Sequence, residues 1–171
     1  MAHPRHADLD ALIVALTEAG VEFVVVGGAA AVLHGAPVTT VDLDVVHRRT
    51  PENVERLLAV LAALESTYRA PTNPGLRPTA ELLLGRGQNL LSTRLGPLDL
   101  LCVLHDQRGY EELLPRTEIM TDERAIIRVL DLDSLIELKA EMNRAKDRLV
   151  LPILLALRAR KPQKREPRVG G

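Results

Sequence analysis

The sequence predicts a mixed α+β domain in which helices flank a central mixed or antiparallel sheet. A β-branched, largely apolar run over 21–26 is typical of a buried strand. Residues 41–46 alternate apolar and acidic side chains, which is the pattern of a strand with two unlike faces. Residues 8–19 instead repeat apolar side chains at helical spacing. The length of 171 residues suggests one such domain.

Helices and strands alternate in the N-terminal third of the chain. Asp8 stands near the start of the first helix, and Gly20 follows its end. Thr50 as a cap and Pro51 at the first helical position mark another helix start. We expect these elements in order: a helix over 8–19, a strand over 21–26, a short helix over 29–34, a strand over 41–46 and a helix over 50–66.

Proline and glycine punctuate the rest of the chain. Gly96-Pro97 joins two strand-like segments into a predicted hairpin. Pro152 is expected to kink a C-terminal helical stretch or to mark its boundary. We expect these elements in order: a loop over 70–79, strands near 88–94 and 97–104, a short helix near 107–114, a strand pair near 116–129, a helix over 131–143 and a helical stretch over 145–159.

These elements predict a single domain over residues 1–160. Its core would extend over about 7–130, and C-terminal helices would occupy about 131–160. Residues 161–171 are rich in basic residues, proline and glycine, so we expect a disordered basic tail there.

The composition excludes several classes of protein. The net charge is −1, which gives no global sign of nucleic-acid binding, and only 2% of residues are aromatic, too few for a base-stacking platform. Cys102 is the only cysteine, so no internal disulfide can form, and a reducing compartment is expected. No stretch approaches the roughly 18 apolar residues of a membrane span. We therefore expect a cytoplasmic protein that makes no membrane contact.

Two glycines, Gly27 and Gly28, stand where the first predicted strand gives way to a helix. Glycine lets a phosphate approach backbone N–H groups closely, and a helix N-terminus adds partial positive charge. Many strand-to-helix turns use glycine for tight geometry alone, so this pair is only weak support for a phosphate site.

Asp42 and Asp44 are two residues apart in a strand-like run, so both side chains are expected on one face. Two neighbouring carboxylates repel each other unless a cation lies between them. Mg²⁺ prefers one or two carboxylates together with phosphate oxygens of the substrate. An exposed edge strand is the ordinary alternative, but the flanking Leu43 and Val45 favour an inner strand.

Asp99 is an isolated charge within the apolar run 96–103. A buried charge is costly unless it is paired or binds a metal. If this strand lies beside the strand over 41–46, Asp99 would face the same side as the other two aspartates. A third carboxylate would complete a two-metal site.

These residues together resemble the nucleotidyltransferase superfamily, which includes DNA polymerase β. Its signature is a Gly-Gly or Gly-Ser helix start, an Asp-x-Asp strand and a third aspartate on a later strand. The resemblance covers roughly residues 20–105. It implies a nucleotidyltransferase-like fold, a site for Mg²⁺ or Mn²⁺, and a nucleoside triphosphate (NTP) as substrate. The implied metal ligands and catalytic residues are Asp42, Asp44 and Asp99.

The C-terminal part resembles small bacterial members of the superfamily, including the abortive-infection toxin type. The resemblance implies that Lys139 contacts phosphates and that Lys146 and Asp147 line the nucleotide pocket. A solvated helix face is the alternative for Lys139. The sequence departs from the pattern in having Val150 where many relatives have a second aspartate.

Two further departures lie near the Asp-x-Asp strand. Pro37, Val38 and Thr39 stand where many relatives have an arginine, and Gly28 replaces a serine that binds phosphate in some of them. These changes leave the metal site intact but put the acceptor in doubt. Thr40 is a candidate phosphate contact, although threonine is also common before a strand.

Two arginines of the predicted hairpin region, Arg86 and Arg94, are further candidates for phosphate binding. The sequence does not distinguish them from ordinary surface arginines. His34 and His47 lack metal-ligand spacing with another His or Cys, which argues against a zinc site.

Two functions of different classes remain open. The first is a metal-dependent nucleotidyltransferase that transfers a nucleoside monophosphate to a tRNA end, a protein side chain or a small molecule such as an aminoglycoside. If the resemblance to the abortive-infection toxins also applies to its biological role, the protein would act in a toxin–antitoxin-type system. The second is a non-catalytic module with the same fold that binds nucleotide or a partner.

Overall fold

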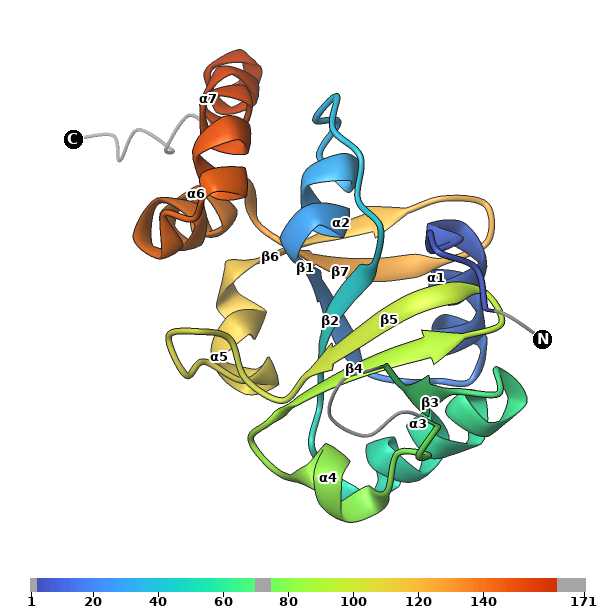
Figure 1. Cartoon of the computed structure of the whole chain (residues 1–171). Helices are drawn as coiled ribbons and strands as arrows, with labels where there is room; N and C mark the ends of the chain where they lie inside the picture. The colour runs from blue at the N-terminus through green and yellow to red at the C-terminus, as the bar shows by residue number, and fades with distance from the viewer. Residues whose placement is uncertain (1–2, 70–74, 163–171) are drawn as a thin grey trace.

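A seven-stranded mixed sheet forms the centre of the protein (Figure 1). The structure is a computed structural model, and it describes residues 3–69 and 75–162. The strand order is β3-β4-β5-β2-β1-β7-β6. The strands are β1 (Phe23–Val26), β2 (Leu43–His47), β3 (Thr67–Tyr68), β4 (Gln88–Thr93), β5 (Gly96–Leu101), β6 (Thr117–Thr121) and β7 (Ile126–Leu130).

Parallel and antiparallel pairs coexist in this sheet. β1 is antiparallel to β2 and parallel to β7, while β2 is parallel to β5. The hairpins β4–β5 and β6–β7 add antiparallel pairs on either side, and β3 pairs with β4. The predicted fold class is therefore confirmed, with a mixed sheet rather than a purely antiparallel one.

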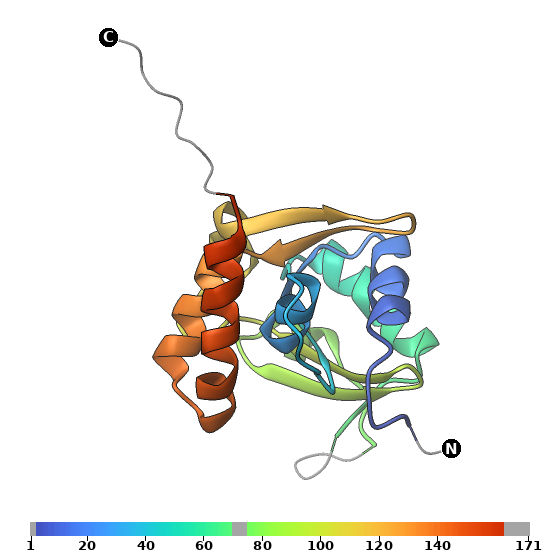
Figure 2. The ribbon, with the colours of Figure 1, turned by 90° about the horizontal axis from the view of Figure 1, so that it is seen from above.

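Helices lie on the sheet and at one end of it. They are α1 (Leu9–Glu18), α2 (Gly27–Leu33), α3 (Pro51–Ala63), α4 (Ala80–Leu84), α5 (Tyr110–Leu113), the 3₁₀ turn η1 (Leu114–Arg116), α6 (Leu132–Met142) and α7 (Ala145–Arg160). α6 and α7 pack against each other and lie at the opposite end of the molecule from α1 and α3 (Figures 1 and 2). No helix among the described residues is long and apolar enough to cross a bilayer.

Helix caps form where the sequence predicts them. The Asp8 side chain accepts a hydrogen bond from the backbone N–H of Ala11, and the Thr50 side chain accepts one from Asn53. Asp131 caps α6 in the same way. A side-chain acceptor at each start satisfies a backbone N–H that has no partner within the helix.

Some element boundaries differ from the predicted ones. α2 begins at Gly27 rather than at 29, and β2 begins at Leu43, so that Asp42 precedes the strand. β5 ends at Leu101 rather than near 104, because the chain turns after the N–H of Cys102 pairs with Gly87. The short elements β3 and α4 were not expected.

Pro152 does not end a helix, because α7 runs through it from Ala145 to Arg160. Its side chain is exposed. Water can therefore solvate the carbonyl that loses its usual N–H partner. Most of the segment predicted to be a basic tail, and half of the loop predicted over 70–79, lie outside the described residues.

The core is aliphatic, as the scarcity of aromatic residues requires. Leu, Val, Ile and Ala from the sheet and from α1, α2, α3 and α6 form one buried cluster, with Phe23 and Tyr110 as its aromatic members. β1 is buried along its whole length because strands pair with it on both sides. This buried centre fixes the register of β1, β2 and β5, the strands that carry the candidate site.

Candidate active site

The sheet register brings two of the predicted aspartates together. β2 and β5 are parallel neighbours in which Asp44 lies opposite Asp99. On either side, Val26 of β1 lies opposite Asp44, and Leu90 of β4 lies opposite Asp99. Directly opposed residues in a sheet share a face, so both carboxylates project from the same face at adjacent positions.

Asp42 completes a cluster of three carboxylates. Each of Asp42, Asp44 and Asp99 offers one oxygen, and the three oxygens lie within 4.8 Å of one another. Asp42 precedes β2 and is held by Thr40, whose Oγ1 lies 3.0 Å from the Asp42 carbonyl oxygen and 3.2 Å from its Oδ1. The predicted convergence of the three carboxylates is thus present in the structure.

Burial makes two of the carboxylates, Asp44 and Asp99, costly to ionise. It raises the pKa of Asp44 to about 6, and the charge of Asp42 adds to the rise. It also raises the pKa of Asp99 to about 7, against the opposing charge of Arg69. A cation bound between the carboxylates would remove this cost, so the electrostatics fit a divalent-metal site.

Glycine is required at position 27 because the Asp44 side chain lies too close to leave room for a Cβ. Its φ is +63°, and a Cβ at this position would stand 2.5 Å from Asp44 Oδ2. At Gly28 a Cβ would stand 2.8 Å from Oγ1 of Thr40. The structure thus gives both glycines a steric role, because they let the start of α2 pack against the aspartate segment. Their predicted contact with phosphate remains a prediction.

A cavity of about 500 Å³ opens beside the carboxylates. Gly27 and the three aspartates form part of its wall, and β4 contributes Leu90. α6, the chain between α6 and α7, and the first turn of α7 line the cavity with cations. These cations are Lys139, Arg144 and Lys146.

Asp147 is placed differently from the prediction. It is fully buried and is not among the residues that line the cavity, so the expectation that it lines the pocket is wrong. It accepts hydrogen bonds from Lys139 Nζ at 3.3 Å and from Arg144 Nε at 2.7 Å, and its Oδ2 also lies 3.2 Å from the backbone N of Arg144. Asp147 therefore anchors two cavity cations from behind. Val150, where many relatives have a second aspartate, packs against the apolar core.

Arg69 is a site residue that the sequence did not reveal. Its guanidinium forms an ion pair with Asp99 Oδ1. Its backbone N–H donates to the carbonyl of Leu90 at 3.0 Å, which places Arg69 next in the cross-strand row beyond Leu90. Only the pairing of β3 with β4 brings it there, and a two-residue strand leaves no pattern in a sequence.

The two candidate arginines of the hairpin region separate in the structure. Arg86 precedes β4 and lines the cavity. Arg94 follows β4 at its other end, where its Nε donates to the carbonyl of Ala63 at 3.3 Å. His34 Nε2 lies 2.8 Å from the carbonyl oxygen of Leu130, which fits a structural role.

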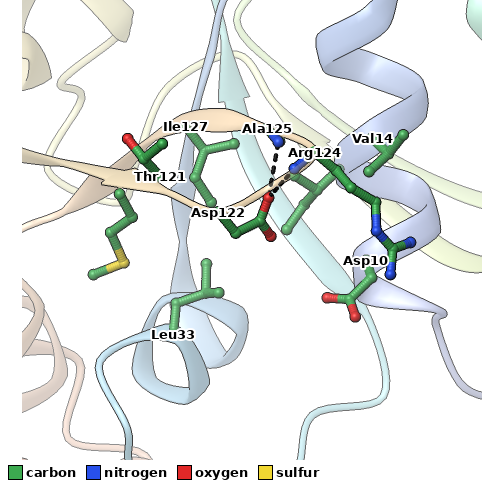
Figure 3. A pocket seen from close by; sticks show the side chains of 10 residues that line it. Asp10, Val14, Leu33, Thr121, Asp122, Arg124, Ala125 and Ile127 are labelled. Atoms are coloured by element: carbon green, nitrogen blue, oxygen red, sulfur yellow. Dashed lines mark hydrogen bonds between the residues drawn. The ribbon is translucent and has the colours of Figure 1, made fainter.

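A second, smaller cavity lies under the β6–β7 hairpin, between α1 and α2 (Figure 3). Its volume is about 130 Å³. The Asp122 carboxylate accepts hydrogen bonds from the backbone N–H groups of Arg124 and Ala125 (Figure 3). The Asp122 carboxylate is thus already hydrogen-bonded by the backbone of its own loop. No cluster of metal ligands forms here among the described residues.

The fold is shared with solved structures that include nucleotidyltransferases. The structure matches the lincosamide antibiotic adenylyltransferase LnuA, bound to lincomycin, with a TM-score of 0.62 and 9% identity, over 90% of this chain and 99% of that one. It matches the candidate nucleotidyltransferase TM1012 of Thermotoga maritima with a TM-score of 0.52 and 15% identity, over 86% and 90% of the two chains. For the antibiotic-resistance factor ANT(2'')-Ia these values are 0.50 and 16%, over 85% and 84%. The sequence itself matches no family model and no curated protein.

Proposed function

We propose that this protein is a metal-dependent nucleotidyltransferase. It would transfer a nucleoside monophosphate from an NTP to an acceptor hydroxyl and release pyrophosphate. The observation that carries the proposal is the cluster of Asp42, Asp44 and Asp99, whose oxygens lie within 4.8 Å of one another on the wall of a large cavity.

The residues present fit a divalent cation. All three ligand groups are carboxylates, the donors that Mg²⁺ and Mn²⁺ favour, and burial raises the pKa of Asp44 and of Asp99. Asp42, Asp44 and Asp99 would hold the metal. When bound, it would lower the pKa of the acceptor hydroxyl and stabilise charge on the leaving pyrophosphate.

Side chains of the protein would bind the phosphates and accept the proton. Lys139 and Lys146 line the cavity and would neutralise phosphate charge. Gly27 leaves space beside Asp44 for the triphosphate. The acceptor oxygen would bond to the α-phosphorus as the bond to pyrophosphate breaks, and Asp99 would receive the hydroxyl proton.

The matched proteins and the toxin-type resemblance suggest different classes of acceptor. Of the matched proteins, LnuA is a lincosamide adenylyltransferase and ANT(2'')-Ia is an antibiotic-resistance factor. A small-molecule acceptor therefore stands beside a tRNA end or a protein side chain, the acceptors suggested by the toxin-type resemblance. We place the protein in the cytoplasm, where its single buried Cys102 would stay reduced.

Calorimetry tests the proposal directly. Each NTP is titrated with and without Mg²⁺ into the wild type and into the double variant Asp42→Asn, Asp44→Asn. We expect Mg²⁺-dependent binding of at least one NTP to the wild type and its loss in the double variant. Binding that is absent from the wild type, or unchanged in the variant, would exclude the metal site and with it the enzyme. Binding that depends on the aspartates without any transfer to total tRNA, lysate protein or antibiotics would favour the non-catalytic module.

A further inference from the structure

The row of aspartates separates the cavity into two sides. β1, α2 and the C-terminal helices lie on the Asp44 side and contribute Gly27, Lys139 and Lys146. The hairpin β4–β5 and strand β3 lie on the Asp99 side. If the triphosphate occupies the Asp44 side, as the proposed function requires, the acceptor must approach Asp99 from β3 and β4.

The side facing β3 and β4 carries two arginines. Arg69 contacts Asp99 directly, and its side chain is 26% exposed. Arg86 lines the cavity just before β4, and it makes no ion pair within residues 3–69 and 75–162. Between them, Gln88 and Leu90 of β4 project from the same face of the sheet and also line the cavity. An acceptor that approaches Asp99 from β4 would therefore meet Gln88, Leu90 and Arg86 on the cavity wall, with Arg69 beside Asp99.

The charge of the whole cavity points the same way. Apart from the three clustered aspartates, every Asp, Glu, Lys or Arg that lines it is a cation. The three aspartates would be neutralised by the metal. Lys139 and Lys146 would be used by the triphosphate, so the cations left for the acceptor are the arginines on the Asp99 side. Guanidinium groups there would attract an anionic acceptor and disfavour a polycationic one such as an aminoglycoside.

We propose, on the basis of the function proposed above, that the acceptor carries its hydroxyl beside a phosphate group and that Arg69 and Arg86 bind that phosphate. The end of an RNA strand and a free nucleoside monophosphate both have this chemistry. Guanidinium groups bind phosphate oxygens through paired, charge-assisted hydrogen bonds. Arg69 is paired with Asp99 in the structure, and it would turn to the acceptor phosphate once Asp99 shares its charge with the metal.

Binding measurements test this assignment without requiring turnover. The probes are a short labelled single-stranded RNA, a nucleoside monophosphate and the aminoglycoside neomycin, each titrated in Mg²⁺ with an α,β-methylene NTP analogue that blocks transfer. We expect the RNA, the monophosphate or both to bind, and neomycin not to bind. Arg86→Gln and Arg69→Gln should each weaken binding about tenfold, the value of one lost charge-assisted contact.

Arg94→Gln is the matched control. Arg94 flanks the same strand as Arg86 but lies outside the cavity, so its loss should leave the affinity within twofold, a difference of about 0.4 kcal/mol. Arg86→Lys should restore part of the affinity, and thermal melts of each variant report whether it is folded.

The outcomes separate this inference from the proposed function. Binding of the RNA alone assigns the acceptor to a strand end, and binding of the monophosphate assigns it to a free nucleotide. Three results would each overturn the phosphate-bearing acceptor. They are equal losses of affinity in Arg86→Gln and Arg94→Gln, binding of neomycin that is tighter than that of the RNA and the monophosphate, and transfer of labelled nucleotide to lysate proteins instead of nucleic acid. In all of these cases Mg²⁺–NTP binding would persist. If Mg²⁺–NTP binding itself is absent, the enzyme proposal fails first.

Discussion

The two walls of the candidate active site are built in different ways. The carboxylate wall belongs to the sheet, where the pairing of Asp44 with Asp99 is set by the register of buried strands. The cationic wall belongs to α6 and α7, where Lys139 and Arg144 are held by the single buried carboxylate of Asp147. The register is fixed by many residue pairs along the strands, so no single residue alone positions Asp44 and Asp99. The positions of Lys139 and Arg144 instead depend on the one side chain of Asp147. The carboxylate wall should therefore tolerate changes around it, and the cationic wall should fail when Asp147 is lost.

The largest effect is expected from Asp44→Asn in the carboxylate wall. The substitution removes a central metal ligand, so transfer should fall by at least about a thousandfold, as when a charge-stabilising group is lost from an active site. The same change relieves repulsion between buried carboxylates, so the metal-free protein should melt at a higher temperature than the wild type. Activity assays and thermal melts in EDTA measure both effects. A variant that keeps its activity would show that the cluster is not catalytic.

Asp147→Ala should damage the other wall through stability as well as binding. It leaves Lys139 without its partner and removes a cap from the start of α7, so we expect a loss of roughly 3 kcal/mol in the free energy of unfolding. NTP binding should weaken, because Lys139 and Arg144 lose their anchor. Urea denaturation and calorimetry check the two effects.

Asp133→Ala is the control for this substitution. Asp133 also pairs with an arginine of α7, Arg158, but both side chains are largely exposed. Its loss should cost under about 1 kcal/mol. Similar losses for the two variants would mean that Asp147 is no more than a surface charge partner and that the cationic wall has no single anchor.

Gly27→Ala should disturb the point where α2 meets the carboxylate wall. The added methyl group faces strain at a φ of +63° and a clash with Asp44, so we expect a cost of about 1–3 kcal/mol and weaker metal binding. Gly35→Ala separates these causes, because Gly35 has a φ of +90° but no atom within 4 Å of the new Cβ. Only the Gly27 variant should lose metal affinity. Equal metal affinity in both variants would remove the steric role of Gly27.

The sequence predicts more of the carboxylate wall than of the cationic wall. The sheet face of Asp44, the isolated charge of Asp99 and the Gly27–Gly28 turn are local features, since alternation and burial within one strand determine them. Arg69 depends on the pairing of β3, a strand of only two residues. The buried position of Asp147 depends on how α6 packs against α7. Contacts between distant segments leave no periodic pattern, so nothing in the residues themselves could correct the cavity position that the family resemblance implied for Asp147.

A smaller effect is expected from pH, and it again depends on the carboxylate wall. The pKa of Asp44 is raised to about 6 and that of Asp99 to about 7, so the folded state binds more protons than the unfolded state between pH 4 and 7. Stability must then fall as the pH rises through this window. In EDTA, lowering the pH from 8 to 6 should therefore raise the contribution of these two groups to stability.

Comparison with Asp44→Asn isolates this contribution. His47 acts in the opposite direction, because its burial lowers its pKa, but it is present in both proteins and cancels in the difference. The gain in melting temperature between pH 8 and 6 should be larger in the wild type by a few degrees, since about 1 kcal/mol corresponds to roughly 2–4 °C in a domain of this size. Saturating Mg²⁺ should abolish the gain in the wild type, because a bound cation keeps the carboxylates ionised in the folded state. Equal pH responses of the two proteins in EDTA would mean that Asp44 is already neutralised by its neighbours, and Lys139 and Lys146 of the cationic wall would then be the first residues to replace.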